Sequence, residues 1–185
     1  RYETLRQLDD NKVFVRYGQA LSILNKVQQQ TTEFYDSKVS SQKPFGLRTY
    51  VVPTEDGDIQ LRYNKGIGPF KRELVTGAFD WIDKWKVITY DHAGRADKDG
   101  KRRIFSTMEV LPPKVVCTET YIVVDTFNSE IEAKNLLQYL KTKFVRFLVA
   151  QVTTTQHISK ANFALVPIQD FSKEWTDAEL YKKYG

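Results

Sequence analysis

Four pairs of an acidic residue and a lysine, each separated by one position, have the spacing best suited to catalysis in this sequence. A metal-dependent nuclease uses carboxylates with a lysine, often in this acid-x-Lys spacing on a strand. The pairs are Asp10/Lys12, Asp36/Lys38, Asp99/Lys101 and Glu132/Lys134. A chain of this composition contains roughly two such pairs by chance. Glu132 falls at a predicted helix start and Asp99 precedes a turn at Gly100, so a nuclease centre is an alternative and not the main hypothesis.

Other catalytic and metal-binding patterns are weaker. His92 and His157 are the only histidines, and neither lies in a ligand-spaced cluster, so no zinc site is expected. No serine lies in a G-x-S-x-G elbow. The segment GIGPF (66–70) lacks the third glycine and the helix start of a phosphate-binding loop, which leaves a turn as its plain interpretation. We therefore expect no catalytic residue, no metal site and no bound cofactor in this chain.

The basic residues are grouped in a way that suits a phosphate backbone. The net charge is +5, and in RADKDGKRR (95–103) seven of nine residues are charged. Lys84 and Lys86 flank Trp85, and a further basic set on a predicted helix is Lys141, Lys143 and Arg146. Lysine and arginine bind phosphates, and arginine also donates paired hydrogen bonds to guanine. A nucleic-acid partner and an ordinary solvated surface are the two explanations that this pattern leaves open.

Alternating apolar residues predict a sheet. TYVVP (49–53) and IQLRY (59–63) flank Asp56-Gly57 and predict a hairpin. KWKVITY (84–90) and RIFSTMEVL (103–111) predict neighbouring strands on either side of RADKDGKRR, with Pro112-Pro113 ending the second. VVCTETYIVVDTF (115–127) is the strongest strand pattern, and FKRELV (70–75) is a further candidate. The charged stretch is then expected to lie at the tip of a hairpin.

Helical spacing of apolar residues predicts a helix over 17–29 and a longer helical region over 129–152. The longer region is either one helix or two helices that meet near Thr142. Ser129/Glu132 and Thr176/Glu179 have the spacing of capping boxes. These elements predict an α/β (α+β) fold in which a twisted mixed or antiparallel sheet packs against helices. Residues 1–172 are expected to form one domain, and 173–185 to begin a truncated helical segment that leads away from it.

Cysteine usage and hydropathy limit the compartment. Cys117 is the only cysteine, so no internal disulfide can form, and an intracellular, cytoplasmic protein is expected. The apolar run around Cys117 predicts that the thiol is buried. No apolar run approaches the length of about 18 residues that a membrane span requires. We expect no membrane partner.

Several segments, taken in order, resemble a known family. They are SSQKPFGLRT, DKWKV, VCTETYIVV, NLLQYLKTKFVRFLVA, ANFALVPIQDFS and WTDAELYKKYG. Together they are similar to the C-terminal target-recognition part of adenine-specific DNA methyltransferases of type II restriction-modification systems, in some of which a nuclease is fused to the same chain. The resemblance runs from about Ala20 to the end of the chain, and the later segments are the more specific.

The resemblance implies a division of labour within a larger parent protein. In this family a catalytic domain binds S-adenosylmethionine and methylates the N6 atom of a flipped adenine, using an Asn/Asp-Pro-Pro-Tyr/Phe motif. Here Pro112-Pro113 is preceded by Leu111 and followed by Lys114, and no glycine-rich cofactor loop is present. The resemblance therefore implies a non-catalytic DNA-recognition domain, with double-stranded DNA and the catalytic domain of the same parent chain as its partners.

The residues expected to contact DNA come from the basic stretches and their neighbours. Phosphate contacts are expected from Lys84, Lys86, Lys101, Arg102, Arg103 and Lys160. Contacts to base edges or nearby phosphates are expected from Arg48, Arg95, Lys98, Gln156 and His157. Two alternatives stay open at this point, which are a metal-dependent restriction nuclease and a protein-interaction module of the same system.

Overall fold

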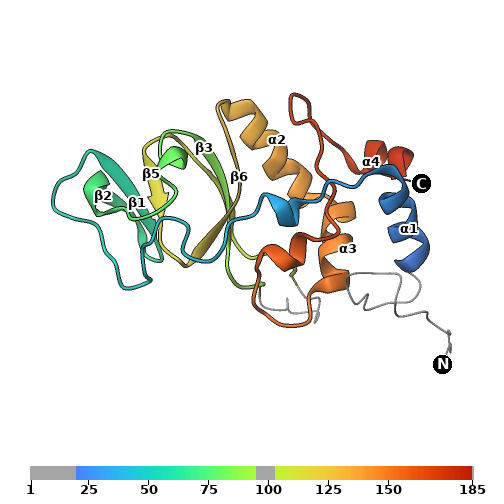
Figure 1. The fold of residues 1–185 in the computed structure, drawn as a ribbon, viewed down its shortest axis with the longest axis horizontal. Helices are drawn as coiled ribbons and strands as arrows, with labels where there is room; N and C mark the ends of the chain where they lie inside the picture. Colours follow the sequence, from blue (N-terminus) through green and yellow to red (C-terminus); the bar gives the residue numbers. More distant parts are fainter. Residues whose placement is uncertain (1–19, 95–102, 185) are drawn as a thin grey trace.

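The computed structural model describes residues 20–94 and 103–184, which form two small sheets beside a group of helices (Figure 1). The helices are α1 (Leu21–Gln30), α2 (Glu130–Lys141), α3 (Lys143–Val152) and α4 (Asp177–Tyr184). Short 3-10 helices are η2 (Tyr35–Ser37), η3 (Arg72–Leu74), η4 (Phe79–Trp81) and η5 (Lys160–Phe163). Within the described ranges, no helix has the length and apolar character needed to cross a membrane. This architecture confirms the α+β class that the sequence predicts.

The central sheet is antiparallel and separates two hydrophobic cores. Its middle strand is β3 (Trp85–Tyr90), which pairs with β4 (Met108–Leu111) on one side and β6 (Tyr121–Phe127) on the other. Neighbouring side chains alternate across the sheet, so Val87 packs with the helices while Ile88 packs with the second sheet. The predicted pairing of 84–90 with 103–111 is confirmed, because Thr89 lies opposite Met108.

The second sheet is smaller and mixed. In it β1 (Ile59–Tyr63) pairs antiparallel with β2 (Gly66–Phe70) and parallel with β5 (Val115–Cys117). The predicted partner of β1 was wrong, since β1 pairs with GIGPF and not with TYVVP. A Cβ at Gly68 would lie 2.7 Å from the ring of Pro53, so the glycine lets the 49–53 segment pass close to β2. Residues 72–74 form η3 and not the additional strand that was expected.

The apolar run 115–127 divides between the two sheets. Residues 118–120 interrupt it, so β5 joins the small sheet and β6 joins the central one. The prediction of one sheet is therefore corrected to two. A continuous apolar run indicates buried strand, but it does not specify which neighbour each half will pair with.

The long helical region is two helices that meet at Thr142. This residue is extended (φ −61°, ψ 153°), and its Oγ1 accepts a hydrogen bond of 3.2 Å from the Val145 amide, which caps α3. The capping box expected at Ser129 does not form a side-chain cap. The one at Thr176 does form, with Glu179 Oε2 accepting from the Thr176 amide at 2.8 Å.

Helix α4 packs back onto the domain. Leu180 and Tyr184 are buried, and the Tyr184 ring stacks on Phe144 of α3 with a centroid separation of 5.2 Å. Gln169 donates a hydrogen bond of 2.7 Å to the Tyr184 hydroxyl. The expectation that 173–185 leads away from the domain is therefore wrong, because the apolar face of α4 completes the helical core.

Candidate nucleic-acid interface

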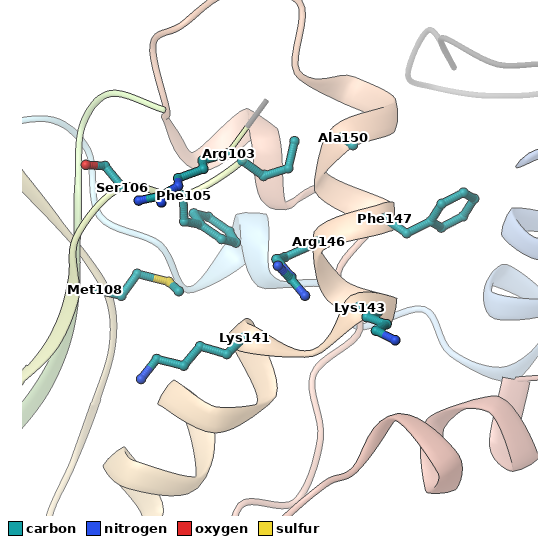
Figure 2. A pocket seen from close by; sticks show the side chains of 10 residues that line it. Arg103, Phe105, Ser106, Met108, Lys141, Lys143, Arg146, Phe147 and Ala150 are labelled. Carbon is teal, nitrogen blue, oxygen red and sulfur yellow. The ribbon is translucent and has the colours of Figure 1, made fainter. Parts of the chain in front are cut away.

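A groove of about 750 Å³ lies between the segment that leads into β4 and the junction of α2 with α3 (Figure 2). One side of the groove, here called the strand wall, is formed by residues 103–108, which lead into β4. The other side, the helix wall, is formed by α2 and α3. The lining residues are Arg103, Ile104, Phe105, Ser106, Met108, Lys141, Lys143, Arg146, Phe147 and Ala150. Figure 2 shows Lys141 and Arg146 reaching from the helices toward the strand wall, where Phe105 and Met108 lie.

Four exposed cations surround this groove: Arg103, Lys141, Lys143 and Arg146. In the part of the chain that the structure describes, none of them pairs with a carboxylate. Four like charges around one concave surface produce a positive potential that attracts anions. The groove is therefore chemically suited to a phosphate-bearing ligand.

Local structure fixes the helix wall of the groove. Thr142 ends α2 and caps α3, and its carbonyl accepts a hydrogen bond of 3.3 Å from Nε of Arg146, which restrains the guanidinium. The carboxylate of Asp177 accepts from the amides of Lys143 and Phe144 at 3.1 and 2.9 Å. These amides at the start of α3 are already satisfied, so an anion in the groove would be held by side chains and not by the helix terminus.

The floor of the groove is apolar and ordered by the core. Phe105 is buried, and its ring packs against Phe163 of η5 at a centroid separation of 5.8 Å. Met108 and Ile104 are partly buried against the same core. An apolar floor beneath exposed cationic side chains is compatible with binding the phosphates of a nucleic-acid backbone.

Arg103, at the end of the charged stretch 95–103, belongs to the wall formed by residues 103–108. Of this stretch only Arg103 is described, whereas the predicted contacts Arg95, Lys98, Lys101 and Arg102 lie outside the described residues. The residues that flank the gap are close together, since a Cβ built on Gly94 would lie 2.7 Å from Cβ of Arg103. Arg103 is thus the described member of the charged stretch that lines the groove.

Lys86 is a correction to the predicted phosphate contacts. Its side chain is fully buried, and its Nζ donates to the carbonyls of Trp81, Ile82 and Lys84 at 3.0, 3.0 and 2.6 Å. Burial lowers the pKa of the Lys86 ammonium to about 8. All three donors are used inside the protein, so Lys86 holds the turn before β3 and is not available to DNA.

The remaining predicted contacts that the structure describes do not line the groove. Lys84 precedes β3 at the end opposite Tyr90, and so lies away from the groove at Met108. Arg48 is exposed and pairs with Glu119 at 3.4 Å. Gln156 and His157 are exposed on the loop between α3 and η5, and Lys160 is exposed at the start of η5. The fold therefore brings Arg103 into the groove. Gln156 lies close to it, because its carbonyl accepts a hydrogen bond from the Ala93 amide and the neighbouring Gly94 packs against Arg103.

The helix cations of the groove were recognised in the sequence as basic but were left out of the predicted contacts. Sequence spacing alone could not show that Lys141, Lys143 and Arg146 would line the same groove as Arg103. The usable signal was their position around Thr142, where a break between helices changes the direction of neighbouring side chains. Tertiary structure places Lys141 and Arg146 opposite residues 103–108, whereas the Lys143 side chain points to the other side of α3 (Figure 2).

The acid-x-Lys pairs do not form a carboxylate site among the described residues. Lys134 pairs with Glu130 at 2.8 Å along α2, and Asp36/Lys38 is an exposed pair at η2. Asp10/Lys12 and Asp99/Lys101 fall outside the described residues. In the described ranges, the group of side chains able to hold a metal ion is Asp91, His92 and His157. The two histidines are not ligand-spaced along the sequence, but the fold brings them together with Asp91.

No family model, no curated protein and no solved structure matches this chain.

Proposed function

We propose that this chain is a DNA-recognition module of a restriction-modification system, which binds duplex DNA beside a separate adenine N6-methyltransferase domain of the same parent protein. The observation that carries the proposal is the groove lined by four cations without carboxylate partners among the described residues. The order of the family-like segments in the sequence supports the same assignment. In this scheme S-adenosylmethionine belongs to the catalytic domain, and the present chain supplies binding.

The physical basis is electrostatic. Each lysine or arginine that neutralises a DNA phosphate releases condensed counterions, so the affinity depends steeply on salt. Such contacts set the position of a protein on the duplex, and base contacts then select the sequence. Arg103 and Arg146 are the described groove residues able to donate paired hydrogen bonds to a base or a phosphate.

The test compares two double variants that remove the same charge. Lys141→Ala with Arg146→Ala removes two cations of the groove, whereas Lys65→Ala with Lys71→Ala removes two from the edge of the small sheet. Duplex binding is measured by fluorescence anisotropy over a range of salt concentrations. The groove variant should lose roughly 10- to 100-fold in affinity and reduce the slope of log K against log salt by about two.

The control variant should stay within about threefold of the unmodified chain, because its cations lie away from the groove. Equal losses in both variants would mean that only net charge matters, and the groove assignment would be wrong. Undetectable duplex binding at low salt would contradict the proposal itself. Metal-dependent cleavage of the duplex would favour a nuclease instead.

A further inference from the structure

Two segments far apart in the sequence bring together Asp91, His92 and His157. Asp91 and His92 directly follow β3, whereas His157 lies on the loop between α3 and η5. One potential ligand atom from each residue lies within 4.8 Å of the other two. The grouping is created by the fold, because 65 positions separate the two histidines, from 92 to 157.

The backbone holds both segments in register. His92 and His157 are opposite one another in an isolated antiparallel bridge. On either side of them, the Ala93 amide donates to the Gln156 carbonyl and the Ile158 amide donates to the Asp91 carbonyl, both at 2.7 Å. The Asp91 amide also donates to the Thr120 carbonyl at 3.0 Å, which ties the cluster to the start of β6. The three side chains therefore start from positions fixed by main-chain hydrogen bonds.

The side chains form a donor set that transition metals prefer. His92 Nδ1 lies 2.8 Å from Asp91 Oδ1, and the two imidazole rings meet edge to face with centroids 5.5 Å apart. Imidazole nitrogens together with a carboxylate oxygen bind zinc and related divalent ions. Tetrahedral coordination places ligand atoms about 3.4 Å apart, so ring rotations of the exposed histidines can close the set around an ion.

A cation would stabilise the nearly buried carboxylate of Asp91. The Asp91 side chain is 11% exposed, and among the described residues its ionisable neighbour within 4 Å is His92, with no lysine or arginine at that distance. A nearly buried carboxylate is costly unless a positive charge or several donors compensate it. A divalent ion held between Asp91 and the two imidazoles would supply that charge.

We propose that Asp91, His92 and His157 bind one divalent transition-metal ion, with Zn²⁺ the best-fitting species and water completing the coordination. The ion would join the end of β3 to the loop between α3 and η5. Gly94, two residues beyond His92, is packed against Arg103 of the groove, so the ion would also stiffen the base of the strand wall. The geometry of this site is independent of DNA binding.

The chain contains few other side chains that could bind Zn²⁺ through nitrogen or sulfur. His92 and His157 are its only histidines, and its only cysteine, Cys117, is buried. The full chain without an affinity tag is treated with a chelator, dialysed, and titrated with Zn²⁺ by calorimetry. One ion per chain should bind. His92→Gln and His157→Gln should each weaken binding at least about tenfold, and Asp91→Asn should weaken it as well.

Spectroscopy identifies the ligands, and exposed controls identify non-specific effects. Cu²⁺ added to the chain should give an electron paramagnetic resonance spectrum with two nitrogen ligands, reduced to one in either histidine variant. Gln156→Ala and Asp80→Asn, both at exposed positions, should leave binding unchanged. Zn²⁺ should raise the melting temperature of the unmodified chain and of these controls, but not of the histidine variants.

Three results would overturn the assignment. The first is an absence of Zn²⁺ binding at micromolar concentrations, and the second is affinity that persists in either histidine variant. The third is affinity that persists in Asp91→Asn, which would remove the carboxylate from the site. DNA binding is not a readout here, so a failed metal site and a failed DNA-recognition function give different results.

Discussion

The cations of the small sheet and the cations of the groove differ in what surrounds them. Beside the small sheet, Arg72 forms a two-point hydrogen bond with Asp83 at 2.7 and 2.8 Å, and Lys71 pairs with Asp56 at 3.3 Å. Around the groove, Arg103, Lys141 and Lys143 have no carboxylate partner in the described ranges. The same residue types are therefore used for internal cohesion in one region and left available in the other.

This difference indicates which of the basic residues are available to bind DNA. Hydrogen bonding and attraction to Arg72 lower the pKa of Asp83, and a backbone hydrogen bond from Arg72 is the main cause of a lowered pKa at Asp58. The Arg72 guanidinium must break its hydrogen bonds to Asp83 before it can bind a phosphate. A cation without such a partner loses less on binding, so the unpaired set is the better candidate for DNA.

Substitution of Lys86 should have the largest effect on stability, because this cation is fully buried and donates only to carbonyls of the protein. Lys86→Met should lower the free energy of unfolding by about 3 kcal/mol, because three carbonyls lose their donor in a buried position. Lys84→Met, two residues earlier and only partly buried, should change it by less than about 0.5 kcal/mol. Urea denaturation followed by circular dichroism measures both. Equal effects would mean that the buried ammonium contributes nothing specific.

The same lysine predicts a dependence on pH. Its pKa is about 8 in the folded protein, below the value near 10.5 expected after unfolding, so the unfolded chain binds more protons between these values. Stability conferred by this group should therefore rise from pH 8 to about pH 10.5. Urea titrations should show the gap between the unmodified chain and Lys86→Met widening by on the order of 2 kcal/mol across that window. A stability difference that decreases across this window would contradict a lowered pKa of the buried Lys86 ammonium.

Asp177 tests how the helix wall of the groove is held. Asp177→Ala should destabilise the protein by about 1–2 kcal/mol, because the amides of Lys143 and Phe144 lose their acceptor. Asp80→Ala, at an exposed position of η4, should have little effect. Thermal unfolding measures both changes. If the two variants melt together, the α3 start is held by Thr142 alone.

Substitutions of Arg72 and Arg103 compare a paired cation with an unpaired one directly, and they should give the smallest changes in stability and affinity. Arg72→Ala should cost at most about 1 kcal/mol of stability, and it should leave duplex binding unchanged. Arg103→Ala should leave stability unchanged and weaken duplex binding roughly fivefold. Urea denaturation measures the stability of both variants, and fluorescence anisotropy measures their affinity for duplex DNA. A loss of binding in Arg72→Ala would remove the distinction between paired and unpaired cations.

Sequence patterns predicted much of the local structure and less of the site. The 84–90 and 103–111 pair, the helical region 129–152 and the Thr176 capping box were predicted correctly, while the choice between one helix and two helices meeting near Thr142 was left open. The partner of β1 was not, because GIGPF has the composition of a turn and becomes a strand through its pairing with β1. The burial of Lys86 was hidden as well, since alternation in KWKVITY assigns a lysine to the solvent side by default.

The sequence by itself determined the fold class, the positive charge and most of the helices, because hydrophobic period and capping residues act over a few positions. Tertiary structure alone decided which strands pair, which lysine is buried, which cations face one groove and that His92 meets His157. These outcomes depend on contacts between residues distant in the chain. Short-range patterns carry no information about the distances across such contacts, so only the folded arrangement reveals both candidate sites.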